Sequence, residues 1–202
     1  MDERTPRQRR HADTRQAILR AARALILEKG PDKLSLREVA RRIGHSPAGL
    51  YEYFGSKEEI VAEVAAEAFG QLGAALRHIP GGLRVDQRLV EIGLAYVEFA
   101  RQNPKHFKLI FTQLPSQRVS AQQPADINSP YQILLQTVQD GIDAETFMAR
   151  ADYGAEEIAY SVWALAHGMA MLQQTHLRQF QADFRAVDRR AFEVFVHGLS
   201  RS

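Results

Sequence analysis

The sequence predicts an all-α protein of about nine helices, on two observations. Apolar residues recur three or four positions apart through most of the 202 residues, as one face of a helix requires. Serine, aspartate and asparagine caps, first-turn prolines and glycine stops divide this pattern into separate helices. The chain has no cysteine, which excludes disulfides, thiolate metal sites and cysteine nucleophiles.

The first helix is predicted from about Asp13 to Lys29, and the glycine and proline that follow would end it. Its inward face would carry Ile18, Ala21, Ala22 and Leu25. The segment before this helix is basic and is expected to form a mobile arm that holds Arg4, Arg7, Arg9 and Arg10.

Charge is distributed unevenly along the chain. Residues 1–42 have a balance of +6, the remaining residues have a balance of −4, and the net charge is +2. A basic end of this kind is the electrostatic feature expected of a surface that faces nucleic acid. The N-terminus lacks the apolar segment of a signal peptide, so we expect a cytoplasmic protein.

The most informative stretch covers residues 34–60. Ser35 is a good helix N-cap, and Glu38 three residues later predicts a capping box. Gly44 lies where the end of this short helix needs a left-handed residue. Ser46 would cap a second short helix, which we predict from Pro47 to Phe54. Two capped helices joined by a glycine turn are typical of a helix-turn-helix.

A third capped helix follows at once. Ser56 would cap it, Glu59 would close another capping box, and Lys57 lies just inside its first turn. The N-terminus of a helix presents free N–H groups and the positive end of the helix dipole, which suit a DNA phosphate. We therefore predict a phosphate contact at Lys57.

The run from Gly44 to Glu59, GHSPAGLYEYFGSKEE, resembles the DNA-binding signature of TetR-family transcriptional regulators. The resemblance covers roughly the first sixty residues. It implies that residues 47–54 read DNA and that Tyr51, Lys57 and basic residues of the first helix hold phosphates. The predicted DNA-binding residues are Ser35, Arg37, Ser46, Pro47, Ala48, Gly49, Tyr51, Tyr53 and Lys57.

One departure from the family pattern bears on how DNA is read. Members of the family often have a hydroxyl or basic residue where this chain has Pro47, Ala48 and Gly49. Because these three offer few side-chain donors, base reading would depend on Ser46, tyrosines, backbone groups and the shape of the DNA.

The helix that begins at Ser56 is predicted to continue to about His78, longer than a DNA-binding module needs. It would link two domains. We predict an N-terminal arm and helix-turn-helix domain at residues 1–58, and a C-terminal ligand-binding and dimerisation domain at 59–202.

Further helices are predicted at about Val85 to Gln102, from Asn103-Pro104 to about residue 114, and from Ser129-Pro130 to about Gly141. Residues 115–128 have no periodicity and are predicted to form a mobile loop. The last helix is predicted from about Asp183 to Leu199.

Residues 158–175 contain no formal charge, which raises the question of a membrane span. Their polar residues leave too short an apolar run, and a buried core helix is the better interpretation. Such a helix, apolar nearly all round, is enclosed by neighbouring helices or by a second subunit.

The C-terminal half also resembles one TetR subgroup, through Trp163-Ala-Leu-Ala-His167-Gly168 and through the aromatic pattern of residues 96–111. This resemblance implies a small-molecule effector in the C-terminal domain. An apolar or aromatic effector would contact Tyr96, Phe107, Phe111, Tyr131, Trp163, His167 and Met171. A lone histidine on a buried helix is also compatible with a hydrogen-bonded core residue, so the role of His167 stays open.

The helix at residues 158–175 and the last helix, from about Asp183 to Leu199, are predicted to build a homodimer. Helix-turn-helix proteins bind half-sites as dimers and need such an interface. The predicted interface comprises Leu165, Met169, Leu172, Val187, Ala191, Val194 and Phe195. The seven histidines show no metal-ligand spacing, and no catalytic constellation stands out, so neither a metal, a cofactor nor an enzyme is predicted.

The resemblance implies a ligand-responsive transcriptional repressor that binds a near-palindromic, double-stranded DNA operator and is released by its effector. Two alternatives stay open. One is a small-molecule-binding protein or enzyme with a vestigial DNA module, against which the basic N-terminal end argues. The other is a non-specific nucleoid-type protein, whose DNA binding would show no sequence preference and a steep salt dependence.

Overall fold

The computed structural model describes residues 5–113 and 129–200, and these residues are almost wholly helical. They contain eight α-helices, one fewer than predicted, because the segment after the turn is a 3-10 helix. Arg4 and the loop predicted at 115–128 lie outside the described residues.

Contacts divide the chain into two compact units. The first contains residues up to Ala68 and, in addition, the residues of α5 (Pro104–Gln113) from Lys105 onward. The second contains Phe69–Pro104 and the C-terminal helices. Helix α3 (Lys57–Arg77) therefore begins in the first unit and ends in the second. Each unit is described below by itself.

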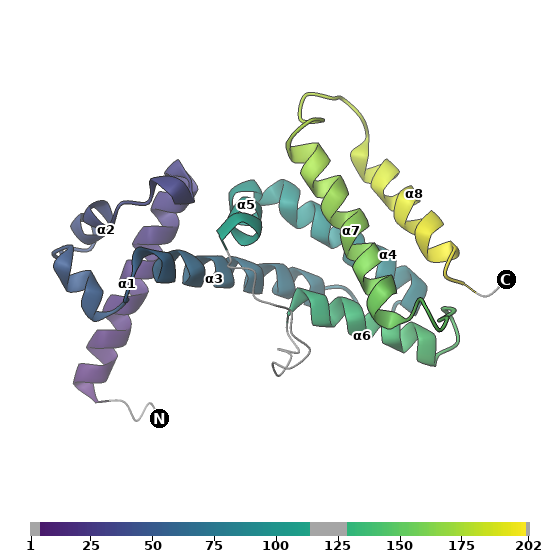
Figure 1. Ribbon diagram of the computed structural model, residues 1–202, viewed down its shortest axis with the longest axis horizontal. Helices are drawn as coiled ribbons and strands as arrows, with labels where there is room; N and C mark the ends of the chain where they lie inside the picture. Colours follow the sequence, from purple (N-terminus) through teal and green to yellow (C-terminus); the bar gives the residue numbers. More distant parts are fainter. Residues whose placement is uncertain (1–4, 114–128, 201–202) are drawn as a thin grey trace. The chain divides into compact units, whose positions relative to one another are not determined.

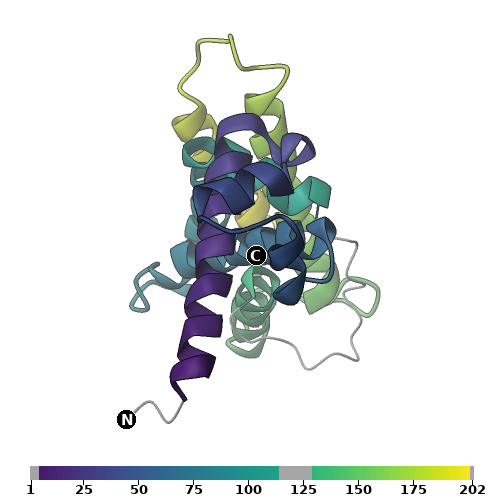
Figure 2. The same ribbon diagram turned by 90° about the vertical axis from the view of Figure 1, so that its left-hand side faces the viewer.

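Helix α1 (Pro6–Lys29) begins seven residues earlier than predicted. Thr5 is its N-cap, and Thr5 and Gln8 form a reciprocal capping box. Pro6 occupies the first turn, where its missing N–H leaves no hydrogen bond unmade. The basic residues predicted to lie in a mobile arm, Arg7, Arg9 and Arg10, are thus helical, and Figure 2 shows α1 as one continuous helix.

Two short helices follow α1 in the first unit. A 3-10 turn, η1 (Pro31–Lys33), leads to α2 (Leu36–Arg42), where the Ser35 hydroxyl accepts a hydrogen bond from the Glu38 N–H at 3.4 Å. Gly44 has φ of +69°, as predicted for the end of this helix. The Glu38 carboxylate does not close a capping box, because it pairs with Lys29 and Arg42 instead.

The segment after the turn is the 3-10 helix η2 (Ala48–Glu52), not an α-helix. A five-residue segment that includes a glycine and follows a proline is too short to sustain an α-helical ladder. Leu50 of η2 and Phe54, which follows it, are buried. Figure 1 shows α2 and the segment that follows it beside α1 and the start of α3.

One hydrophobic core holds the first unit together. It contains buried residues of α1, α2, η2 and α3, among them Ile18, Val39, Leu50 and Ile60. Leu109 of α5 (Pro104–Gln113) belongs to the same core and is fully buried. The Lys105 ammonium also donates to the Leu27 carbonyl near the end of α1. Helix α5 is therefore part of this unit.

The second unit packs α4 (Val85–Gln102) against α6 (Pro130–Asp143), α7 (Ala155–Gln174) and α8 (Phe184–His197). Figure 1 shows α7 and α8 side by side. Ser129 and Asp183, where these two helices were predicted to begin, cap α6 and α8. Asn103, expected to cap α5, donates its side-chain and backbone N–H groups to the Phe99 carbonyl at the end of α4.

No helix of the described residues is long and apolar enough to cross a membrane.

Candidate functional site

The recognition segment, residues 46–54, presents a mostly exposed surface on the first unit. Ser46, Pro47 and Ala48 are exposed, and Tyr51 retains 58% of its side-chain surface. The Ser46 hydroxyl accepts a hydrogen bond from the Gly49 N–H at 3.0 Å. A Cβ at Gly49 would lie 3.2 Å from that hydroxyl, so glycine suits the cap. The surface offers the Ser46 hydroxyl, the Tyr51 phenol, the Glu52 carboxylate and backbone groups to a ligand.

Tyr53 is half-buried, as are the predicted contacts Ser35, Gly49 and Lys57, and its ring packs on other aromatic rings. Its ring lies 4.6 Å from the His11 ring of α1 and 6.5 Å from the His45 ring in the turn, between centroids. Sequence reasoning missed His11, because it placed the start of the first helix at Asp13. The signal was present in Thr5-Pro6, an N-cap followed by a first-turn proline.

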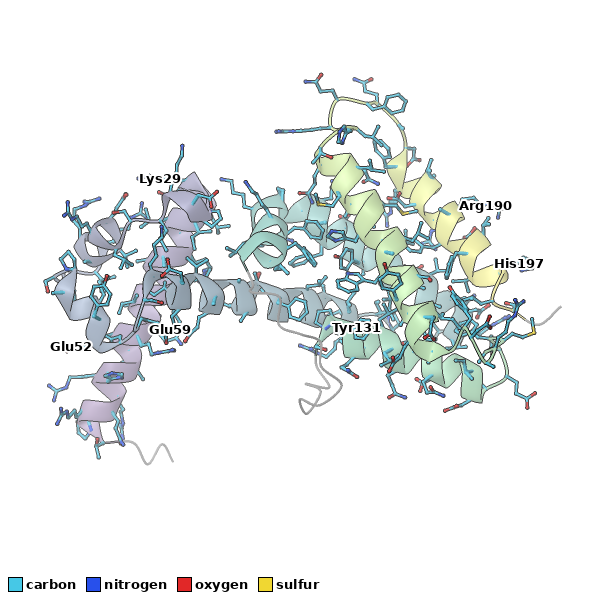
Figure 3. The ribbon with its side chains drawn as sticks, in the orientation of Figure 1. Lys29, Glu52, Glu59, Tyr131, Arg190 and His197 are labelled. Atoms are coloured by element: carbon cyan, nitrogen blue, oxygen red, sulfur yellow. The ribbon has the colours of Figure 1, made fainter. Side chains whose placement is uncertain are left out.

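The remaining predicted contacts lie at two helix N-termini. Ser35 caps α2, and Arg37 is exposed in the first turn of that helix. Ser56 accepts a hydrogen bond from the Glu59 N–H at 3.1 Å, and the Glu59 carboxylate accepts one from the Gly55 N–H at 2.6 Å. Lys57 is the first residue of α3 and is half-buried. Figure 3 shows Glu52 and Glu59 in this part of the unit.

Ion pairs fasten α1 to its neighbours. Arg42 of α2 pairs with Glu28 at 2.6 Å, and Lys29 pairs with Glu38 at 2.7 Å. Hydrogen bonding from Arg42 lowers the pKa of the Glu28 carboxyl below its usual value. Arg15 and Arg23 of α1 pair with carboxylates of α3. Arg42 therefore links α2 to α1, although both Arg41 and Arg42 are exposed.

Four of the predicted effector residues form one cluster in the second unit. The Trp163 indole N–H donates to the Tyr96 hydroxyl at 3.3 Å, and a 2.9 Å hydrogen bond joins that hydroxyl to His167 Nδ1. The Tyr131 ring packs edge-on against Trp163, with centroids 5.9 Å apart. Burial raises the pKa of Tyr96 and lowers that of His167, so both are neutral near pH 7.

The other three predicted effector residues are not in this cluster. Phe107 and Phe111 pack on each other at 4.8 Å and belong to α5, in the first unit. Met171 lies on α7 and is 41% exposed. Tyr131, labelled in Figure 3, comes from the first turn of α6.

The predicted dimer residues leave apolar surface exposed on α7 and α8. Leu172, Val187 and Val194 are about half exposed. The other four members, Leu165, Met169, Ala191 and Phe195, are partly buried. Arg190, which projects from α8 in Figure 3, and Val187 border a shallow apolar groove on this helix.

A buried carboxylate lies between α7 and α8. Asp188 is 5% exposed, and both of its oxygens accept from the Gln173 amide, at 3.0 and 2.9 Å. Burial raises the pKa of Asp188 above its usual value, with the Gln173 hydrogen bond acting in the opposite direction. Ionised Asp188 is therefore a cost to folding at neutral pH.

Asp188→Asn should stabilise the protein at pH 7, by about 1 kcal/mol, because its one amide oxygen can still accept from Gln173 and no charge is buried. The raised pKa gives the sign of the pH dependence. Wild-type stability falls as pH rises above the unfolded-state pKa of Asp, so the advantage of the variant should vanish toward about pH 4. The urea midpoints of the wild type and of Asp188→Asn, at pH 7 and at about pH 4, measure this difference. Asp152→Asn, at an exposed position, is the control and should leave the midpoint unchanged.

No group of three or more residues able to hold a metal ion occurs within residues 5–113 and 129–200.

Comparison with known proteins agrees with this arrangement. Residues 18–64 match the family described as "Bacterial regulatory proteins, tetR family", and residues 89–199 match "Tetracyclin repressor-like, C-terminal domain". An uncharacterized HTH-type transcriptional regulator of Mycobacterium tuberculosis is 33% identical over 93 residues, which is 46% of this chain and 44% of that protein. The match thus spans less than half the length of this curated relative.

Solved structures share the fold over most of the chain. A protein of unknown function from Rhodococcus sp. RHA1 has a TM-score of 0.75 at 23% identity, covering 93% of this chain and 95% of that one. A TetR family transcriptional regulator from Thermus thermophilus has a TM-score of 0.57 at 23% identity, covering 91% and 99%. Because the second family match covers more than half of the sequence, the chain belongs to the tetR family of bacterial regulatory proteins.

Proposed function

We propose that the protein is a ligand-responsive, DNA-binding transcriptional regulator that acts as a dimer on a near-palindromic operator. The exposed recognition segment on a basic helix-turn-helix unit carries this proposal. Family membership favours a regulator over an enzyme. A DNA-binding protein of this family would act in the bacterial cytoplasm. We further propose that it is a repressor.

In the proposed complex, Pro47, Ala48 and Gly49 offer the major groove small apolar surfaces, and Ser46 and Tyr51 offer hydroxyls. Direct base contacts are few on such a surface, so shape and backbone contacts supply part of the preference. Arg37 and Lys57, at the N-termini of α2 and α3, would hold phosphates.

The aromatic cluster of the second unit is the proposed effector site. Tyr96, Tyr131, Trp163 and His167 combine ring surfaces with a few polar atoms, a composition that suits an apolar or aromatic molecule with a hydrogen-bonding group. Effector binding releases DNA only if the effector prefers a DNA-incompetent conformation. Two stretches of chain can carry that coupling, because α3 runs through both units and the chain passes from α4 into α5 at Pro104.

The proposed dimer interface is the exposed apolar face of α7 and α8. Leu172, Val187 and Val194 each leave about half of their surface uncovered in the single chain. A second copy that packs on this face would bury them and bring together two recognition segments, as a two-fold operator requires.

Tyr51→Ala should weaken binding to the regulator's own upstream DNA by about tenfold or more, because the exposed phenol supplies a polar contact to the duplex. Fluorescence anisotropy measures the affinity for this fragment and for a scrambled one at about physiological salt. Tyr160→Ala, at an equally exposed tyrosine of α7, is the matched control and should leave binding unchanged.

Equal, salt-sensitive binding of the wild type to native and scrambled fragments would count against sequence reading at the upstream site. Selection of genomic fragments would then show whether an operator lies elsewhere. If no fragment is preferred, the proposal of a sequence-specific regulator is wrong.

A further inference from the structure

Two residues of α1 contact the end of the recognition segment. His11 lies against the Tyr53 ring, with centroids 4.6 Å apart and planes tilted by 33°. The Arg15 guanidinium lies 4.5 Å from the centroid of the Phe54 ring. His11 and Arg15 are four residues apart on a helix and therefore lie on one face, which continues into the buried residue Ile18.

The recognition segment has little support of its own. η2 contains five residues in 3-10 geometry, and Gly49 lowers its helix propensity further. Leu50 and Phe54 are its buried anchors. Tyr53 is half-buried and lies against His11, with His45 edge-on to the same ring. The contact that α1 makes with Tyr53 therefore adds to the support that Leu50 and Phe54 give the segment.

We propose that His11 and Arg15 form a clamp that positions the recognition segment, and that Tyr53 is held by this clamp and does not read bases. This assigns His11 a positioning role in DNA recognition. Tyr51 lies two residues from Tyr53, so a loss of the clamp lets the exposed phenol leave the geometry that the DNA requires. The inference rests on the proposed DNA-binding function.

Arg15 is not the residue to test, because it also pairs with Glu63 of α3 and its removal would break that ion pair as well. His11 has an exposed side chain, and its ring contact with Tyr53 can be removed by alanine or kept by phenylalanine. Gln16 is an exposed residue of the same helix and supplies a control.

Anisotropy with native and scrambled DNA should show that His11→Ala and Tyr53→Ala each weaken binding to the native fragment by about twofold to tenfold, the range of one aromatic contact. Binding to scrambled DNA should stay within about twofold. His11→Phe, Tyr53→Phe and Gln16→Ala should match the wild type. The double alanine variant should bind no more weakly than the weaker single variant, because both remove the same contact.

Three results would overturn the clamp. If Tyr53→Phe and Tyr53→Ala lose the same affinity for the native fragment, the Tyr53 hydroxyl reads DNA. Additive effects in the double variant would mean that the rings act independently. An equal loss on both DNA fragments in His11→Ala would mean that His11 contributes a contact common to any DNA and does not position the recognition segment.

A readout without DNA separates the clamp from the proposed function. In the NMR spectrum of the free protein, the His11 Hε1 resonance should carry a ring-current shift that disappears in Tyr53→Ala and persists in Tyr51→Ala. If the wild type prefers no DNA fragment, the proposed function fails, and this measurement alone decides the clamp. A His11 resonance that ignores Tyr53→Ala would refute it.

Discussion

Leu109→Ala should unfold the first unit at a clearly lower urea concentration than in the wild type and leave the second unit intact. Leu109 is fully buried in the core that α1, α2 and α3 form, although it comes from α5, far along the sequence. Truncation of such a leucine leaves a cavity and costs about 2–5 kcal/mol. Far-UV circular dichroism follows both units, and the fluorescence of Trp163, the chain's one tryptophan, follows the second unit.

The matched control is Leu134→Ala, the same truncation at a buried residue of α6 in the second unit. Leu134→Ala should lower the urea midpoint that Trp163 fluorescence follows. Leu109→Ala should lower the midpoint of the first unit, which appears in the circular dichroism and not in the Trp163 fluorescence. A Trp163 midpoint that falls equally in both variants would show that α5 does not belong to the first unit alone.

The placement of α5 illustrates what sequence could not predict. Apolar spacing located this helix correctly, at Pro104–Gln113, since periodicity depends on the residues of the helix itself. Periodicity identifies the buried face of a helix and not its partner. Leu109 and Phe107 were therefore assigned with the C-terminal helices, whereas the contacts of α5 with Leu27 and the first core are long-range.

The helix-turn-helix could be predicted in more detail because capping is local. Ser35, Gly44, Ser46 and Ser56 each have the predicted role, and each depends on residues at most four positions away. The start of α1 was predicted wrongly for an equally local reason, because the basic segment before Asp13 was interpreted as a mobile arm, although Thr5 caps a helix that begins at Pro6.

The aromatic cluster of the second unit could be predicted only in part. The sequence supplied candidate aromatic and histidine residues, and the structure brings Tyr96, Trp163 and His167 into hydrogen-bonding contact. Side chains on α4 and α7, separated by 71 positions, meet only through packing of the whole unit. Their roles toward an effector remain predictions.

Packing between α4 and α8 leads to the second large expected effect. A Cβ on Gly93 would lie 2.4 to 2.7 Å from three ring carbons of Phe192, which is 1% exposed. The ring cannot retreat without moving α8, since it is enclosed in the core. Gly93→Ala should therefore destabilise the second unit by about 1–3 kcal/mol, although alanine favours a helix. The Trp163 unfolding midpoint measures this loss.

Gly70→Ala is the matched control, because a Cβ at Gly70 of α3 meets no atom within 4 Å. That variant should gain about 0.5–1 kcal/mol from helix propensity alone. Val187 and Val194 lie on α8, so the displacement of this helix in Gly93→Ala should also weaken self-association in analytical ultracentrifugation. Weaker self-association in Gly93→Ala with an unchanged Trp163 midpoint would contradict the packing argument. A lower midpoint with unchanged self-association would mean that the face of α8 is not the dimer interface.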